Sequence, residues 1–128
     1  MYELKVLTRF AAAHQLKMVT KKCENLHGHN WKVELYVAGE KLESGVLVDF
    51  GLIKARLGEI IDTLDHRFLN ELPSFAGRNP SSETIAKYIA DEFAKKIDDH
   101  PEFYVSRVSV WESDDACATY IPPKAPVS

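Results

Sequence analysis

Hydrophobic and polar residues alternate along two stretches near the start of the chain, over residues 2–14 and 27–37. Successive side chains of a β-strand point to opposite faces of the sheet, so a period of two is typical of strands that bury one face. We therefore predict two strands joined by a polar connection over residues 15–26, which is long for a hairpin loop. Two further β-rich runs, at 104–112 and 116–121, flank a polar turn and predict a hairpin near the end of the chain.

Apolar residues in the middle of the chain recur at the helical spacing of three or four positions. Residues 51–64 show this spacing and follow Asp49, whose carboxylate can cap the start of a helix. A short apolar run at 46–48 predicts a short strand before that helix. A second helix is predicted behind Ser81 and Ser82, whose hydroxyls can cap it. Its apolar stripe consists of Ile85, Ile89, Phe93 and Ile97.

The predicted order, β-β-α-α-β-β, favours an α+β fold in which two helices cover one face of an antiparallel sheet. We expect a single domain over residues 1–121 and a loose Pro-rich tail over 122–128. The strands offer more apolar positions than one small domain can hide, among them Trp31, Trp111 and Tyr120. Association of several copies would cover these positions, so we predict an oligomer.

The composition is that of an ordinary globular protein, with 45% hydrophobic and 27% charged residues. The 16 Lys and Arg residues against 19 Asp and Glu give a net charge of −3, which provides no positive field to collect nucleic acid or anionic membrane. Apolar runs are far shorter than the about 20 residues that cross a bilayer. The start of the chain does not have the layout of a secretion signal, so we expect a cytoplasmic protein that binds neither nucleic acid nor membrane.

The two cysteines, Cys23 and Cys117, stand far apart in the chain and form no Cys-x-x-Cys pair. This spacing argues against zinc fingers, haem attachment and thioredoxin chemistry. In a reducing compartment we expect both thiols to be free.

Three of the 5 histidines belong to the first two predicted strands. His27 and His29 are two positions apart, which places them on one face of a strand about 6.5 to 7 Å apart, and His14 ends the neighbouring strand. Three imidazoles suit zinc, and three protein ligands leave a coordination position for water or substrate, as in catalytic zinc sites. The alternative is that each histidine is an ordinary core or surface residue. Because the three share a face, metal binding is the favoured interpretation.

Four other residues could carry chemistry, although each also has an ordinary explanation. Cys23 lies four residues before His27 and could be a base or nucleophile, or an inert thiol. Asp65 and His66 could relay a proton, but such a pair is also common at the C-terminal end of a helix, where the helix dipole favours a positively charged imidazole. Glu112 ends an apolar strand and could accept two N–H donors from an amidine-like heterocycle, or simply face water. Taken alone, the last three residues favour the ordinary explanation.

Six short segments, spread in order over nearly the whole chain, form a specific set: Phe10–His14, Cys23–Asn30, Val48–Phe50, Leu64–His66, Asn79–Glu83 and Trp111–Ser113. This set resembles the family of 6-pyruvoyl-tetrahydropterin synthases and 6-carboxy-tetrahydropterin synthases. The resemblance implies the tunnelling fold, in which subunits join their sheets into a barrel, as trimers stacked into hexamers with sites between subunits. The implied roles are zinc ligation by His14, His27 and His29, general-base catalysis by Cys23, proton relay by Asp65 and His66, pterin anchoring by Glu112, and lining of the pterin pocket by Ser81 and Ser82.

The resemblance also implies the substrate, 7,8-dihydroneopterin triphosphate. Three residues separate Cys23 from His27, the compact spacing of the bacterial carboxy branch of queuosine biosynthesis, which releases acetaldehyde and triphosphate. One alternative is the pyruvoyl synthase of biopterin synthesis, which eliminates triphosphate and releases no acetaldehyde. Another is a non-catalytic zinc-binding module, against which the intact Cys23, Asp65, His66 and Glu112 argue.

Overall fold

The structure is a computed structural model, and it describes residues 1–17 and 26–123. The predicted α+β order is confirmed, with a short strand and two 3₁₀ turns added between the helices. The elements are β1 (Tyr2–His14), β2 (His27–Gly39), α1 (Phe50–Ile61), β3 (Arg67–Phe68), η1 (Leu69–Glu71), η2 (Pro73–Phe75), α2 (Ser82–Lys96), β4 (Tyr104–Ser113) and β5 (Ala116–Tyr120).

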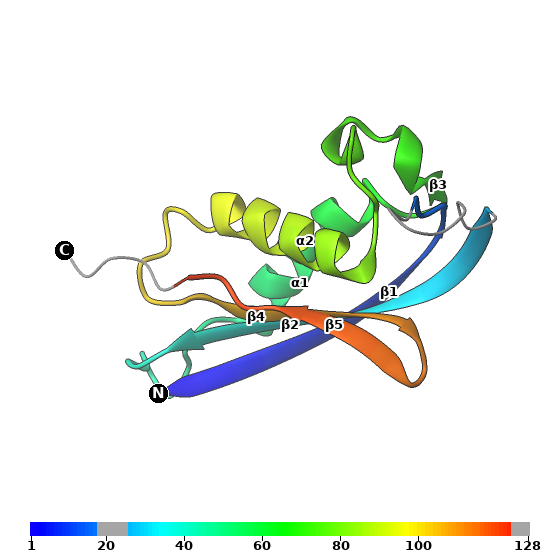
Figure 1. Cartoon of the computed structure of the whole chain (residues 1–128). Coiled ribbons are helices and arrows are strands. Elements are labelled where there is room, and N and C mark those ends of the chain that lie inside the picture. The colour runs from blue at the N-terminus through cyan, green and yellow to red at the C-terminus, as the bar shows by residue number, and fades with distance from the viewer. Residues whose placement is uncertain (18–25, 124–128) are drawn as a thin grey trace.

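The strands form one sheet in the order β3-β1-β2-β4-β5, and both helices lie on the same face of it (Figure 1). β1 and β2 pair antiparallel without interruption from Tyr2 opposite Gly39 to His14 opposite His27. The sheet is mixed rather than purely antiparallel as predicted, because β3 pairs parallel with β1. Two residues are too few to show a periodicity, so sequence patterning could not reveal β3.

The core lies between the helices and the face of the sheet made by even positions of β1 and odd positions of β2. Trp31 is 0% exposed within the single chain, stacks on Phe10, and donates its indole N–H to the carbonyl of Ala12. The prediction that Trp31 is a surplus apolar residue was therefore wrong. Trp111 pairs opposite Lys32 and so lies on the helix-free face. Tyr120 is partly buried and packs against the core.

The segment before α1 differs from its prediction. Val46 forms only an isolated bridge to Glu43, and no strand covers residues 46–48. Leu47 and Val48 are apolar because they are buried in the core, not because they belong to a strand. Asp49 caps α1 as predicted, since its carboxylate accepts the backbone N–H of Gly51 at 3.0 Å. Among the described residues, no helix has both the length and the apolar character needed to cross a membrane.

Candidate metal centre

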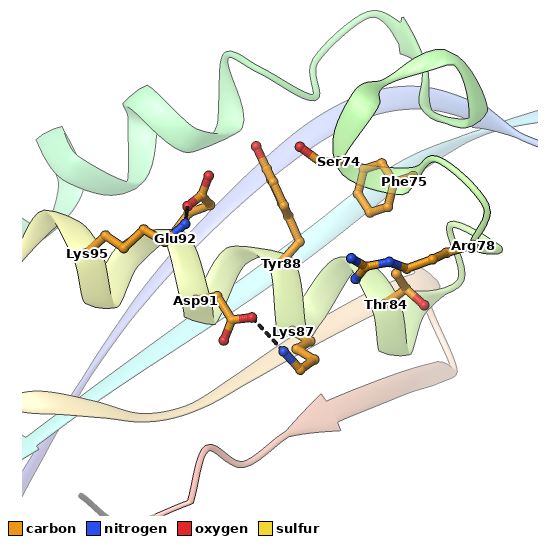
Figure 2. Close-up of a pocket in the computed structure, with 9 residues that line it drawn as sticks. All are labelled: Ser74, Phe75, Arg78, Thr84, Lys87, Tyr88, Asp91, Glu92 and Lys95. Atoms are coloured by element: carbon orange, nitrogen blue, oxygen red, sulfur yellow. Dashed lines mark hydrogen bonds and ion pairs between the residues drawn. The ribbon is translucent and has the colours of Figure 1, made fainter.

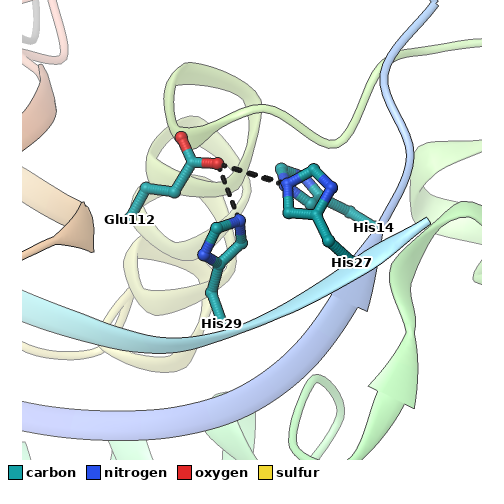
Figure 3. A group of neighbouring side chains, drawn as sticks. All are labelled: His14, His27, His29 and Glu112. Atoms are coloured by element: carbon teal, nitrogen blue, oxygen red, sulfur yellow. Dashed lines mark hydrogen bonds and ion pairs between the residues drawn. The ribbon is translucent and has the colours of Figure 1, made fainter. Parts of the chain in front are cut away.

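Three imidazoles and one carboxylate converge at one end of the sheet, on the face that carries the helices (Figure 3). The pairing of β1 with β2 sets His14 opposite His27, and His29 follows two positions later on the same face. Nε2 of His14 lies 3.1 Å from Nε2 of His27. The ligand atoms of all four residues lie within 4.8 Å of one another, so this group could hold a metal ion. Glu112 is the fourth member of the group.

Glu112 reaches the histidines because of the pairing of β4 with its two neighbours. Trp111 faces away from the helices opposite Lys32, so the next side chain points toward the helices. A bulge then follows, since Trp111 pairs with Cys117 but Ser113 pairs with Ala116, which leaves Glu112 as the extra residue. Bulges commonly redirect a side chain next to an active site. Sequence reasoning could assign Glu112 to a substrate but could not place it beside the imidazoles, because neither the register nor the bulge shows in the residue pattern.

His14 is oriented by a contact that leaves one ring nitrogen available to a metal. Its side chain is 0% exposed, and its Nδ1 lies 2.8 Å from the carbonyl oxygen of Pro80. A neutral imidazole donates its proton to this carbonyl from Nδ1, so its Nε2 keeps a lone pair directed at the cluster. Metal-binding histidines commonly have their second nitrogen fixed in this way.

His29 contributes a buried nitrogen to the same point. Its Nε2 has no hydrogen-bond partner of good geometry within residues 1–17 and 26–123, although Oε1 of Glu112 is 2.9 Å away. Burial is the main cause that lowers the pKa of His29; the charge of Glu112 opposes it, and the neighbouring His27 and His14 lower it further. A neutral imidazole is the form that binds metals. Three imidazole nitrogens and one carboxylate oxygen form a donor set that fits zinc.

Asp65 and His66 lie at the outer side of β1 rather than in the cluster. The backbone N–H of Ala11 donates to Asp65 at 2.9 Å, and the backbone N–H of His66 donates to the Ala11 carbonyl at 2.6 Å. The hydrogen bond from Ala11 is the largest cause that lowers the pKa of Asp65. Nδ1 of His66 lies 3.0 Å from Asp65, while its side chain is 81% exposed. His66 has a φ of 58°, which is a strained backbone conformation for a residue other than glycine. Such strained residues cluster at functional sites.

A shallow hollow is lined by backbone or side-chain atoms from both His29 and His66. It also involves residues 11–13 of β1 and the start of β2. The structure therefore brings His66, one member of the predicted relay pair, and His29, one predicted zinc ligand, to the edge of the same depression.

Ser81 and Ser82 begin α2. Oγ of Ser81 accepts the backbone N–H of Thr84 at 3.2 Å and so caps the helix, while Ser82 is buried. Because Pro80 precedes this cap, the helix start and His14 are directly connected.

Cys23 lies outside the described residues. Cys117 is a free, exposed thiol, as predicted.

A separate pocket lies on the outer side of α2, where Figure 2 shows a row of charged side chains. Its charges largely neutralise one another, since Lys87 pairs with Asp91 at 2.6 Å and Lys95 pairs with Glu92 at 3.0 Å. The four-residue cluster is therefore the better candidate for chemistry.

The chain is similar to known proteins over most of its length. Residues 3–123 match the family model described as 6-pyruvoyl tetrahydropterin synthase. A 6-carboxy-5,6,7,8-tetrahydropterin synthase of Synechocystis sp. is 36% identical over 121 residues, which cover 90% of this chain and 89% of the relative. A dihydroneopterin monophosphate aldolase of Pyrococcus furiosus is 33% identical over 106 residues, covering 83% and 85%. The solved 6-pyruvoyl tetrahydropterin synthase of Caenorhabditis elegans superposes with a TM-score of 0.83 at 23% identity, over 95% of this chain and 96% of that one.

Proposed function

The chain belongs to the 6-pyruvoyl tetrahydropterin synthase family, and on that premise we propose that it is a zinc-dependent 6-carboxy-5,6,7,8-tetrahydropterin synthase. Its substrate would be 7,8-dihydroneopterin triphosphate, and its products 6-carboxytetrahydropterin, acetaldehyde and triphosphate. The observation that carries this proposal is the convergence of His14, His27 and His29, whose ligand atoms lie within 4.8 Å of one another. A zinc ion held there supplies Lewis-acid polarisation of the hydroxyls on the substrate side chain.

The remaining residues have proton-transfer and binding roles in this proposal. Cys23 is the general base that removes a proton from the substrate side chain, and His66 returns one elsewhere. Asp65 holds that ring in place, because its carboxylate lies 3.0 Å from Nδ1 of His66. Glu112 accepts N–H donors from the pterin ring, because a carboxylate matches the edge of an amidine. Ser81 and Ser82 line the pterin pocket.

Two observations support the carboxy product. The Cys23-to-His27 spacing is the compact one, and the relative from Synechocystis sp. has that name at 36% identity. The Pyrococcus furiosus relative, at 33% identity, supports a second candidate, an aldolase that acts on dihydroneopterin monophosphate. The third candidate is the pyruvoyl synthase, and the activity assay described below distinguishes all three.

We further propose a cytoplasmic homo-oligomer, a hexamer built from two trimers, that serves queuosine biosynthesis. The exposed imidazole of His66 at the edge of the sheet supports such an assembly, because a relay residue that faces outward can serve a site completed by a neighbouring subunit. Sedimentation velocity of the zinc-loaded protein tests the assembly, and a monomer would contradict it.

The activity is tested by incubating the zinc-loaded protein with 7,8-dihydroneopterin triphosphate and, separately, with dihydroneopterin monophosphate. Acetaldehyde together with triphosphate is the expected result. Triphosphate without acetaldehyde indicates the pyruvoyl synthase, and cleavage of the monophosphate alone indicates the aldolase. No product from either compound indicates a non-catalytic module. As a control, Cys23→Ala should abolish turnover but keep the zinc content, and loss of zinc would show that the thiol is a ligand.

A further inference from the structure

The carboxylate of Glu112 stands where a fourth metal ligand would stand. Its Oε1 lies 2.9 Å from Nε2 of His29, 3.3 Å from Nε2 of His14 and 3.7 Å from Nε2 of His27. In a tetrahedral zinc site with bonds of about 2.0 to 2.1 Å, the donor atoms are about 3.3 Å apart. The distances from Oε1 of Glu112 to the three nitrogens are thus close to those between zinc ligands. The sequence gives no sign of this, because Glu112 is far from the histidines along the chain.

The position of Glu112 is built into the sheet rather than being a chance rotamer. On the opposite face, Trp111 donates its indole N–H to the buried carboxylate of Glu34, and the ammonium of Lys32 lies 4.3 Å from the centre of the indole ring. These contacts hold the strand immediately before the bulge and so keep Glu112 on the side of the histidines.

Glu112 also differs from the histidines in its freedom to leave. Its side chain is 36% exposed, whereas that of His14 is 0% exposed and tied to Pro80. A glutamate has a flexible stem, so it can exchange at a metal while a buried, hydrogen-bonded imidazole cannot.

We propose that Glu112 is the fourth metal ligand of the substrate-free protein and leaves the metal when the pterin substrate binds. The displacement rests on the proposed function, whereas the ligation does not. Departure of the carboxylate opens one coordination position for a hydroxyl of the substrate. It also frees both oxygens of Glu112 to accept N–H donors from the pterin ring, so one residue serves both states.

The ligation is tested without substrate, by zinc competition titration and by the visible spectrum of the Co²⁺-substituted protein. Glu112→Gln should bind zinc about 10- to 100-fold more weakly than wild type, and its Co²⁺ bands should change in position and intensity, because a neutral ligand such as water takes the place of the carboxylate. Glu102→Gln is the matched control, because Glu102 also contacts a histidine, His100, at 2.8 Å outside this cluster. Circular dichroism verifies that each variant is folded, and Glu112→Asp, which keeps the charge on a shorter stem, should be intermediate. Unchanged affinity and spectrum in Glu112→Gln would overturn the ligation.

The displacement is tested by adding 7,8-dihydroneopterin triphosphate to Co²⁺-loaded Cys23→Ala protein while calorimetry follows binding. The expected result is a spectral change that saturates with binding. Binding with no spectral change would overturn the displacement alone. Absence of any binding would overturn the displacement together with the proposed function, while the ligation measured without substrate would stand.

Discussion

The indole N–H of Trp111 donates to the carboxylate of Glu34 on the face of the sheet that carries no helix. Glu34 is buried there, and it also lies 3.2 Å from the ammonium of Lys5. Burial by itself would raise the pKa of Glu34, but the hydrogen bonds from Trp111 and Lys5 and the charges of Lys5 and Lys32 outweigh it, so the pKa is lowered. One ionised side chain therefore joins β1, β2 and β4 across the sheet.

This relationship predicts that Glu34 stabilises the fold at neutral pH and not in acid. Because its pKa is lower in the folded chain than in the unfolded chain, the stabilisation is full above the unfolded pKa and is lost as the pH falls through the folded one. Glu34→Gln should be less stable than wild type by about 1 to 3 kcal/mol at neutral pH, and the difference should shrink toward about pH 3. Urea unfolding of both proteins over that range measures it. A difference that does not depend on pH would show that the charge of Glu34 contributes nothing.

Gly39 is predicted to be the glycine of the chain that tolerates a side chain least. A Cβ at this position would lie 2.5 Å from the backbone oxygen of Glu102 and 2.5 Å from Cδ1 of Leu47. Gly39→Ala should therefore destabilise the fold by about 1 to 3 kcal/mol. Gly58→Ala is the matched control: nothing lies within 4 Å of its added Cβ, so alanine in α1 should stabilise by about 0.4 to 1 kcal/mol. Thermal unfolding should move the two variants in opposite directions, and equal shifts would contradict the packing at Gly39.

Periodicity along the sequence predicted the long elements of the fold correctly because each of them buries one continuous face. The strand at 2–14 was right at both ends, and the stripe from Ile85 to Ile97 is buried against the sheet. Periodicity failed where burial comes from distant contacts. Leu47 is apolar because it packs into the core beside Gly39, not because it belongs to a strand.

The candidate site shows the same division between local and distant information. The shared face of His27 and His29 follows from a period of two, and His14 follows from pairing the first two strands end to end. The contact of His14 with the carbonyl of Pro80 joins residues 66 positions apart, and residue types alone carry no signal for it. Glu112 was recognised as a functional candidate, but its distance from the imidazoles depends on a bulge in β4.

Zinc should stabilise the folded chain through the histidine cluster. A ligand present at 100 times its dissociation constant adds about 2.7 kcal/mol, which for a domain of this size raises Tm by roughly 10 °C. His29→Ala should abolish both the rise in Tm and stoichiometric zinc binding, because it removes a buried donor atom. His100→Ala removes an imidazole that pairs with Glu102 instead, and it should behave like wild type. Loss of zinc binding in both variants would indicate a general effect on folding instead of a site.

His66 should be essential to turnover and dispensable to the fold. Its φ of 58° favours asparagine over alanine as a replacement, since asparagine adopts this conformation more readily. His66→Asn should therefore keep Tm and zinc content while kcat falls about 10²- to 10⁴-fold. His66→Ala should show the same loss of kcat and, in addition, a lower Tm. A His66→Asn variant with wild-type kcat would remove His66 from the reaction.

Ser81 has a visible role as a helix cap and a proposed role in the pterin pocket, and two substitutions separate them. Ser81→Ala removes the oxygen that accepts the backbone N–H of Thr84, so it should cost about 1 kcal/mol of stability. Ser81→Asp keeps an acceptor and places a negative charge at the helix start, where the dipole favours it, so its stability should match wild type. If Ser81 also lines the pocket for a triphosphate substrate, the added charge should raise KM about tenfold, equivalent to about 1.4 kcal/mol, while kcat changes little. Thermal unfolding and steady-state kinetics on the two variants measure these effects. A wild-type KM in Ser81→Asp would show that Ser81 caps α2 and does not line the pterin pocket. Its structural role would then be to fix the start of α2, next to Pro80, whose carbonyl contacts His14.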